Sequence, residues 1–348
     1  MIKQSALGLF LVLSLILDQY AFPAANSDGR FTIVNKFNAG GQGRWDLLSF
    51  DTSHHHIFIS RSSHVQVVDS ETGKVVGDIP DTDGVHGIAI AEDLNLGFTS
   101  NGKSNSVTVF DLNKLNILET IKVNGVNPDA ITYEPKTKHI LSFNGLSHSV
   151  SVIDAIARKE VATIDLPGKP ELAVSDNGDN VFVNIEDKNE IAVIDVNTNK
   201  VVKIYPFASG TEPTGLAIDI KHHRLFSVCA NNKMEILDSE TGHVVSEVPI
   251  GGGPDSAAFD SELGIALSSN GDGTLTVVKE SDPDHFNVLQ NLTTQKGART
   301  MVYDETLHRA YLVTATFGET PPPTADQPKP RPSTVPDSFV ILVAGQQL

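Results

Sequence analysis

The chain has few of the residues that carry covalent or redox chemistry. Only one of its 348 residues is cysteine, so no disulfide can form within the chain. This residue, Cys229, lies in the apolar stretch RLFSVCAN, and we expect a buried, unreactive thiol. The sequence has no G-x-S-x-G, H-E-x-x-H, C-x-x-C-H or P-loop motif. No linear signature therefore indicates a serine hydrolase, a zinc protease, a haem protein or a nucleotide-binding enzyme.

Positive charge is also scarce. The chain has 26 Lys and Arg residues against 43 Asp and Glu residues, which gives a formal net charge of −17 at pH 7. No run of Lys or Arg suggests a basic patch. An acidic surface repels phosphate groups, so nucleic acid and anionic membranes are unfavourable partners.

The one long hydrophobic run is at the start of the chain. Lys3 precedes the apolar residues 5–17, which are followed by polar and small residues. This pattern is typical of a secretory signal peptide and is short for a membrane span. We therefore expect a signal peptide at residues 1–25 and a single secreted or periplasmic domain at 26–348, with no membrane span after cleavage. An uncleaved anchor is the alternative.

The dominant feature of the chain is a self-similar unit of about 42 residues. Its clearest mark is a strand that ends in Asp before a short turn, at Asp69, Asp111, Asp154, Asp195 and Asp238. Each unit can be divided into four short strands rich in Val, Ile and Phe, which is typical of a β-propeller blade. We predict an all-β fold, a seven-bladed β-propeller of four-stranded antiparallel blades.

The last blade has only three strands of its own, at 299–304, 309–314 and 339–344. Residues 30–38 form a strand that precedes blade 1 and belongs to no unit. We predict that this N-terminal strand completes the last blade (3+1), because closure removes the open edges of the ring. A Pro-rich insertion at 318–337 interrupts the last blade with seven prolines. It is either a lid or docking arm, or a tolerated floppy insertion.

Tight turns join the third and fourth strands of two blades. They read SETGKVV at 70–76 and SETGHVV at 239–245. We expect Gly73 and Gly242 to supply the positive φ that such turns require.

Two segments carry a family resemblance. FVNIEDKNEIAVIDVNTNKVV (182–202) and VVSEVPIGGGPDSAAFDS (244–261) resemble the YVTN-repeat, YncE-like family of secreted bacterial propellers, and the resemblance covers nearly the whole mature chain. It implies a WD40-like propeller that acts as a binding protein without a common catalytic set. DNA binding is described for some members, but the net charge of −17 argues against that role here.

A ring of polar residues is predicted at one mouth of the central channel. Aligning the start of the first strand in each blade gives Asp46, His86, Asp129, Glu171, Thr214, Asp255 and Arg299. Carboxylates crowded around a channel either have raised pKa values or are offset by a cation. Ca²⁺ prefers oxygen ligands, so Asp129, Glu171 and Asp255 are candidate metal ligands. The alternative is that these side chains bind loop backbone and hold neighbouring blades together.

Other residues are expected near the mouth or on the opposite face. Arg44, Trp45 and Arg61 are predicted on the mouth face, and Trp45, the only Trp, is either a stacking platform or loop packing. His54–His56 and His222–His223 are predicted in turns on the opposite face. We expect these turns to be solvated, although such a cluster could bind a transition metal adventitiously.

These features predict a monomeric binding or interaction module. Its acidic mouth would face a small polar ligand, a cation or a protein partner. The alternative is a lactonase-like hydrolase or lyase that uses a Ca²⁺-class ion, with His86 as acid and base. The sequence leaves open whether the protein is an enzyme.

Overall fold

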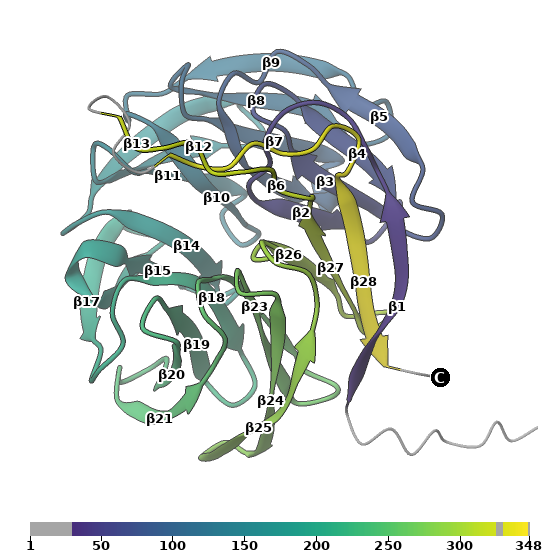
Figure 1. Ribbon diagram of the computed structural model, residues 1–348. Helices are drawn as coiled ribbons and strands as arrows, with labels where there is room; N and C mark the ends of the chain where they lie inside the picture. The colour runs from purple at the N-terminus through teal and green to yellow at the C-terminus, as the bar shows by residue number, and fades with distance from the viewer. Residues whose placement is uncertain (1–29, 325–329, 347–348) are drawn as a thin grey trace, which may run out of the picture.

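The computed structural model describes residues 30–324 and 330–346. The expected signal peptide, residues 1–25, lies outside the described residues. Within the described residues, the strands form seven four-stranded antiparallel sheets arranged as blades in a ring (Figure 1). This arrangement confirms the predicted seven-bladed β-propeller. The helical segments of this part of the chain are two single 3₁₀ turns, η1 (Glu92–Leu94) and η2 (Glu186–Lys188).

Each of the first six blades is built from four consecutive strands. Blades 1 to 3 comprise β2 (Leu48–Asp51), β3 (His56–Ser60), β4 (Val65–Asp69), β5 (Val75–Ile79), β6 (Val85–Ala91), β7 (Leu96–Asn101), β8 (Ser106–Asp111), β9 (Ile117–Lys122), β10 (Pro128–Glu134), β11 (His139–Asn144), β12 (Ser149–Asp154) and β13 (Lys159–Asp165). Blades 4 to 6 comprise β14 (Pro170–Ser175), β15 (Asn180–Ile185), β16 (Glu190–Asp195), β17 (Lys200–Pro206), β18 (Pro213–Asp219), β19 (Arg224–Cys229), β20 (Lys233–Asp238), β21 (Val244–Pro249), β22 (Pro254–Asp260), β23 (Ile265–Asn270), β24 (Thr274–Asp282) and β25 (His285–Thr293).

Blade 7 closes the ring with strands from both ends of the chain. It comprises β26 (Met301–Asp304), β27 (Arg309–Thr314), β28 (Val340–Gln346) and the N-terminal β1 (Phe31–Asn38). β1 pairs antiparallel with β28, from Phe31 opposite Gln346 to Asn38 opposite Val340. Figure 1 shows the purple β1 alongside the yellow β28. The predicted 3+1 closure is therefore confirmed.

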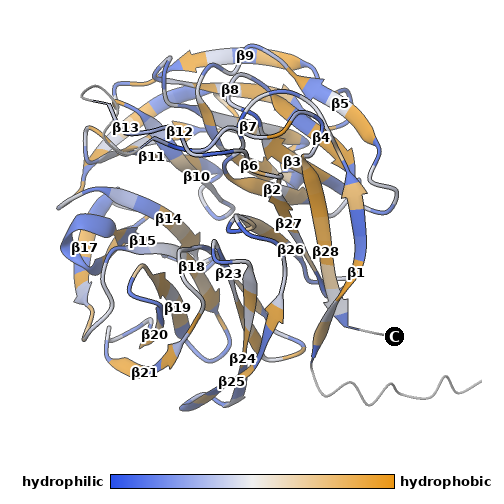
Figure 2. Cartoon of the chain, in the orientation of Figure 1, coloured by the Kyte–Doolittle hydropathy of each residue, from blue (hydrophilic) through white to orange (hydrophobic). Residues whose placement is uncertain are grey.

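The hydrophobic core is divided into seven clusters, one between each pair of neighbouring blades. Alternate residues of a strand supply the two neighbouring clusters. In β11, Ile140 packs against blade 2, whereas Leu141 and Phe143 pack against blade 4. Figure 2 shows hydrophobic residues concentrated in strands such as β28, whereas outer strands such as β1 and β17 also carry hydrophilic residues. Cys229 is fully buried, and burial raises the pKa of its thiol to about 12, as expected for an unreactive residue.

The repeated Asp residues stabilise the turns between the third and fourth strands. Oδ1 of Asp69 accepts a hydrogen bond from the backbone N–H of Thr72 at 2.8 Å, and Asp195 does the same with Thr198 at 2.8 Å. The hydrogen bond from the Thr72 hydroxyl is the main cause that lowers the pKa of Asp69. The hydrogen bond from the backbone N–H of Thr198 is the main cause that lowers the pKa of Asp195. The feature that revealed the repeat is therefore structural.

Gly73 and Gly242 end two of these turns with φ values of 70° and 75°, as predicted. Their hydrogen atoms also face an aromatic ring. A Cβ at Gly73 would lie 2.2 Å from Phe37, and one at Gly242 would lie 2.0 Å from Tyr205. The fourth strand of the preceding blade therefore requires glycine at both positions.

Candidate functional site

His86 occupies the centre of an acidic group at the channel mouth. Its Nδ1 lies 2.7 Å from Oδ2 of Asp46 and 3.7 Å from Oδ1 of Asp129, each at the beginning of a neighbouring blade. The hydrogen bond to Asp46 is the main cause that raises the pKa of His86. Burial raises the pKa of Asp129. The imidazole thus offsets the charge of two carboxylates from different blades.

Lys169 balances a second pair of acids at the mouth. Its Nζ lies 2.7 Å from Oε1 of Glu171 and also forms an ion pair with Glu186. Burial raises the pKa of Glu171 to about 8. Burial opposes the charge of Lys169, but hydrogen bonds to Glu171 and Glu186 outweigh it and raise its pKa.

Arg299 balances the most deeply buried carboxylate of the ring. Its Nε lies 3.2 Å from Oδ2 of Asp255. Burial raises the pKa of Asp255 to about 7, and the Arg299 charge counteracts this rise. Thr214 has a different role, because its hydroxyl donates to the carbonyl of Pro254 at 3.1 Å and links blades 5 and 6.

The mouth therefore neutralises its acids with its own cations and with raised pKa values. The expected Ca²⁺ ligands Asp129, Glu171 and Asp255 do not come together as one group. In the described residues, Asp129 instead joins Asp46 and His86, whose potential ligand atoms lie within 4.8 Å of one another. The sequence predicted the ring but missed Lys169, which lies just before β14 and outside the aligned positions.

The structure shows that the prediction of Arg61 as an accessible residue of the mouth face is wrong. Its side chain is buried, with 1% exposure, and donates to the carbonyls of Gly40 at 2.9 Å and Gly43 at 3.1 Å. Its guanidinium also lies 3.9 Å above the ring of Phe339. Arg61 holds the loop between β1 and β2 in place and is inaccessible to a ligand.

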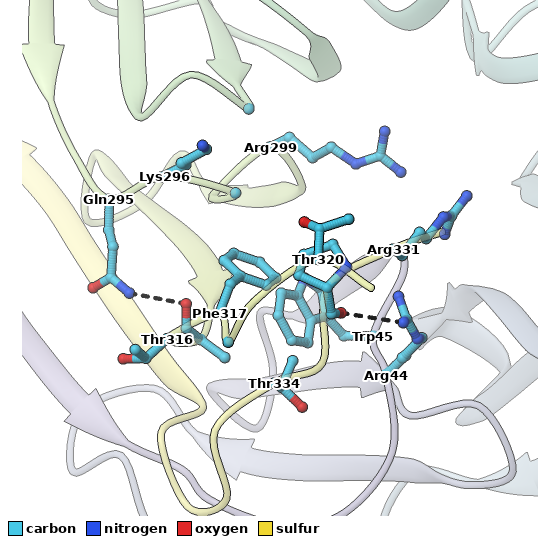
Figure 3. Close-up of a pocket in the computed structure, with 15 residues that line it drawn as sticks. Arg44, Trp45, Gln295, Lys296, Arg299, Thr316, Phe317, Thr320, Arg331 and Thr334 are labelled. Atoms are coloured by element: carbon cyan, nitrogen blue, oxygen red, sulfur yellow. Dashed lines mark hydrogen bonds between the residues drawn. The ribbon is translucent and has the colours of Figure 1, made fainter. Parts of the chain in front are cut away.

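The main pocket lies beside the ring, where blades 6, 7 and 1 meet. It has a volume of about 710 Å³. The β1–β2 loop contributes Arg44 and Trp45, the loop after β25 contributes Lys296 and Arg299, and the segment between β27 and β28 contributes Arg331. Figure 3 shows Arg44, Arg299 and Arg331 gathered on one side of the pocket. Arg299 thus belongs to both the pocket and the ring.

The Pro-rich insertion supplies one wall of this pocket. Phe317 and Thr334 form a β-bridge, and the backbone N–H of Gly318 donates to the carbonyl of Ser333 at 2.8 Å. Nη2 of Arg44 approaches the carbonyl of Pro332 at 3.4 Å. The two ends of the insertion are therefore paired with each other and held against the propeller.

Trp45 packs within the loop region and also lines the pocket, where a role in stacking on a ligand stays a prediction. Its ring packs on Phe339 at 5.0 Å between centroids and on Phe317 at 6.1 Å, and it lines the pocket. Trp45 and Phe317 therefore give the pocket an apolar surface beside its basic groups (Figure 3).

Among the described residues, none that lines the pocket is acidic, although the chain carries a net charge of −17. Its basic residues are Arg44, Lys296, Arg299 and Arg331. Among the described residues, Arg44, Lys296 and Arg331 form no ion pair with a carboxylate. Because they come from separate segments, no Lys or Arg run marked them in the sequence.

Comparisons with known proteins found one partial family match and leave the ligand open. The family model of the anaphase-promoting complex subunit 4 WD40 domain matches residues 178–258. Among solved structures, the chain is similar to hydrazine synthase of Kuenenia stuttgartiensis, with 18% identity, a TM-score of 0.49, and coverage of 67% of this chain and 95% of that chain. No curated protein sequence matches the chain. Within residues 30–324 and 330–346, no helix is long and apolar enough to span a membrane.

Proposed function

We propose that this β-propeller is a binding module that takes a small organic anion in the pocket between blades 6, 7 and 1. The observation that carries the proposal is the pocket's lining, whose described residues include four basic side chains and no carboxylate. Cations that lie together without a neighbouring carboxylate create a local positive potential in an otherwise acidic protein, and this potential attracts an anion.

The lining residues favour a particular class of anion. Arg guanidinium groups match the geometry of carboxylates and phosphates, and Arg44, Arg299 and Arg331 converge on one side of the pocket. Trp45 and Phe317 offer an apolar surface to the rest of the ligand. The ligand that fits best carries a carboxylate or phosphate group on a planar or apolar body.

This proposal replaces the acidic mouth as the ligand-binding surface. The carboxylates of Glu171 and Asp255 already pair with Lys169 and Arg299. A Ca²⁺ ion at these positions would have to compete with those cations, so no observation favours the lactonase-like alternative. A protein partner could bind in the same pocket if the basic side chains there contact one of its acidic side chains or its C-terminal carboxylate.

The single Trp provides a direct test. Phenyl phosphate and benzoate should change the fluorescence of Trp45 in a saturable way, whereas benzyl alcohol and benzylamine should not. The double variant Arg44→Ala/Arg331→Ala should weaken phenyl phosphate binding at least about tenfold, because it removes charge-assisted hydrogen bonds. Lys103→Ala is the matched control, since Lys103 is an exposed cation paired with Asp83 outside the pocket.

Two results would overturn the proposal. One is an equal fluorescence response to benzylamine and to phenyl phosphate, which would show that charge does not select the ligand. The other is unchanged phenyl phosphate binding in the double variant. Raising the salt concentration should weaken genuine anion binding, because these basic groups are exposed.

We also propose that the module acts outside the cytoplasm. The support is the sequence pattern of residues 1–25, which is typical of a secretory signal peptide. The mass of the protein recovered from a secreting host tests this directly. A mature chain that begins near residue 26 is expected, and a full-length chain retained inside the cell would contradict the proposal.

A further inference from the structure

A second cluster of ligating side chains lies on the face opposite the pocket. Asp219 ends β18, His222 lies in the following turn, and Glu280 comes from β24 of the next blade. Nδ1 of His222 lies 2.6 Å from Oδ2 of Asp219 and 2.9 Å from Oε1 of Glu280. Potential ligand atoms of all three residues lie within 4.8 Å of one another. The cluster therefore joins blades 5 and 6.

The carboxylates of this cluster are buried and short of hydrogen-bond donors. Asp219 is 2% exposed and Glu280 is 7% exposed. Within the described chain, Oδ2 of Asp219 and both carboxylate oxygens of Glu280 lack a hydrogen bond of regular geometry. Nδ1 of His222 carries at most one proton, so it can satisfy only one of these three oxygens. Two buried carboxylates with so little compensation destabilise the fold unless a cation or a proton joins them.

Related turns in other blades show how a buried Asp carboxylate is balanced by hydrogen-bond donors. In blade 1, Asp51 and His54 have the same spacing, with Nδ1 2.7 Å from Oδ2, and Nε2 of His54 meets the amide oxygen of Asn113 at 2.8 Å. In the part of the chain that the structure describes, no second buried carboxylate joins this pair.

The corresponding Asp of blade 6 is also fully satisfied. Oδ2 of Asp260 lies 2.6 Å from the hydroxyl of Tyr303 and 2.7 Å from Nδ1 of His308. Its Oδ1 accepts backbone N–H groups of the turn. The cluster in blade 5 differs from both turns because Glu280 adds a buried acid and no donor.

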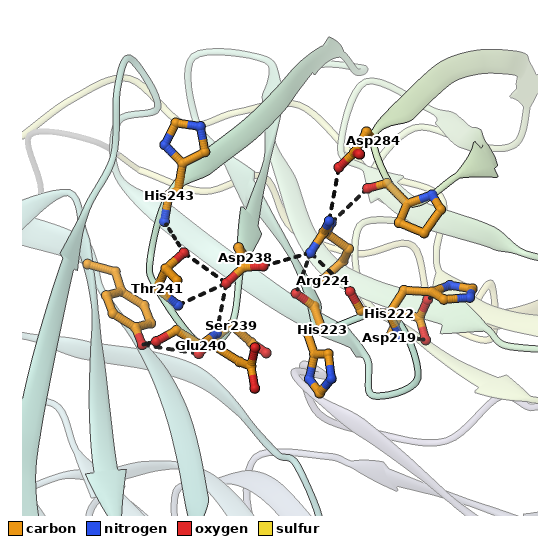
Figure 4. Close-up of polar contacts among 12 residues, drawn as sticks. Asp219, His222, His223, Arg224, Asp238, Ser239, Glu240, Thr241, His243 and Asp284 are labelled. Atoms are coloured by element: carbon orange, nitrogen blue, oxygen red, sulfur yellow. Dashed lines mark hydrogen bonds and ion pairs between the residues drawn. The ribbon is translucent and has the colours of Figure 1, made fainter.

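The surrounding contacts hold the ligating atoms in place. Oδ1 of Asp219 accepts the backbone N–H of Lys221 at 2.9 Å, which leaves Oδ2 facing His222. Arg224 donates to the carbonyl of His222 at 3.0 Å and to the carbonyl of Pro283 at 2.7 Å (Figure 4). This guanidinium therefore fixes the turn of blade 5 against the β24–β25 turn of blade 6. Such supporting contacts are typical of preorganised metal sites.

We propose that Asp219, His222 and Glu280 bind a divalent metal ion of the zinc class between blades 5 and 6. One imidazole nitrogen and two carboxylates are ligands that Zn²⁺ uses commonly, and a solvent molecule completes a tetrahedral shell. An imidazole ligand counts against Ca²⁺, which prefers oxygen alone. The side chain of His222 is 34% exposed, so the ion has access from solvent. Metal binding requires an unprotonated Nδ1, so a proton that Nδ1 carries in the metal-free protein is released to solvent or moves to Nε2 on binding.

Equilibrium dialysis of the EDTA-stripped full chain against ZnCl₂ tests the site, with bound zinc measured by elemental analysis. The wild-type protein should retain one zinc ion at this site, and its melting temperature should rise with zinc occupancy. Glu280→Gln and His222→Asn should each weaken zinc binding at least about tenfold. His54→Asn is the matched control, because blade 1 has the same Asp–His spacing without a second acid.

The variants also separate loss of the site from loss of the fold. Without metal, Glu280→Gln should melt no lower than the wild type, because it removes a buried charge. If Glu280→Gln fails to fold, the partly exposed His222→Asn carries the test. The proposal is overturned if no zinc is retained. It is equally overturned if zinc remains in both variants and is lost only in His54→Asn or Asp46→Asn, which would assign it to surface histidines or to the channel mouth.

Discussion

The channel mouth and the pocket beside it differ in how their charges are balanced. At the mouth, Lys169 pairs with Glu171 and Arg299 pairs with Asp255, while His86 lies between two acids. In the pocket, Arg44 and Arg331 form no ion pair with a described carboxylate, and no acid is among the described lining residues. The two regions share only Arg299.

This difference separates charges that maintain the scaffold from charges that can recruit a ligand. A buried acid that has a cation from its own chain gains little from an external ion, because binding would require that cation to leave. An exposed cation that has no ion pair breaks no contact within the protein when it binds an anion. Removing a residue from the mouth should therefore affect stability, whereas removing one from the pocket should affect binding.

The largest effect is expected when Lys169 is replaced at the mouth. Lys169→Met leaves the half-buried Glu171 and Glu186 without their cation. We expect the free energy of unfolding at pH 8 to fall by about 2–3 kcal/mol, somewhat less than for a fully buried pair because Lys169 is partly exposed. Urea denaturation measures this change.

Lys188→Met is the matched control for this experiment. Lys188 lies in the same blade, and its Nζ is 3.7 Å from an exposed Asp187 carboxylate. Its loss should change the free energy of unfolding by less than about 0.5 kcal/mol. Equal effects of the two substitutions would show that the mouth is not an internally balanced ring.

A smaller effect is expected in the pH dependence of stability. Burial raises the pKa of Glu171 in the folded state to about 8, above the ordinary value of 4.5. The stability that this group contributes is fully present below pH 4.5 and is lost as pH rises toward 8. Glu171→Gln should therefore remove about 2 kcal/mol of the decrease in unfolding free energy between pH 5 and 8, after allowance for the lysine and solvent.

Denaturation curves at pH 5, 6.5 and 8 test this expectation, with the exposed Glu119→Gln as control. Asp255 should leave a residual slope in Glu171→Gln, because burial raises its pKa to about 7. The turn residues Asp69 and Asp195 act in the opposite direction. Their pKa values are lowered in the folded state, so the stability that they contribute is lost only as pH falls below about 4. Parallel curves for wild type and Glu171→Gln would contradict the assignment.

The architecture was predictable because five of the seven blades repeat the same local requirements. The Asp at the end of the third strand caps a turn, and Gly73 and Gly242 supply the positive φ of that turn in two blades. The unpaired strand 30–38 implied the closure that β1 and β28 form. Such features are local or periodic, so they are visible in a single sequence.

The charges of the site were less predictable because they depend on contacts between distant segments. The sequence placed the ring residues by their register but missed Lys169, which lies outside the aligned positions. Arg61 shares the mouth face, yet the loop at Gly40–Gly43 covers it. Arg44 comes from the loop between β1 and β2, and Arg331 comes from the segment between β27 and β28. They line the same pocket only because both ends of the chain contribute strands to blade 7. Neither composition nor net charge reveals such a local excess of positive charge.

The smallest effect on stability is expected in the pocket, where it should accompany a clear loss of binding. Arg331→Gln removes an exposed cation that has no described ion pair, so the free energy of unfolding should change by less than about 0.5 kcal/mol. Phenyl phosphate titrations that follow Trp45 should nevertheless show weaker binding. Arg299→Gln should reduce both properties, because Arg299 lines the pocket and also pairs with Asp255. If Arg331→Gln lowers stability as much as Arg299→Gln does, the pocket is part of the scaffold, and the distinction between the two regions fails.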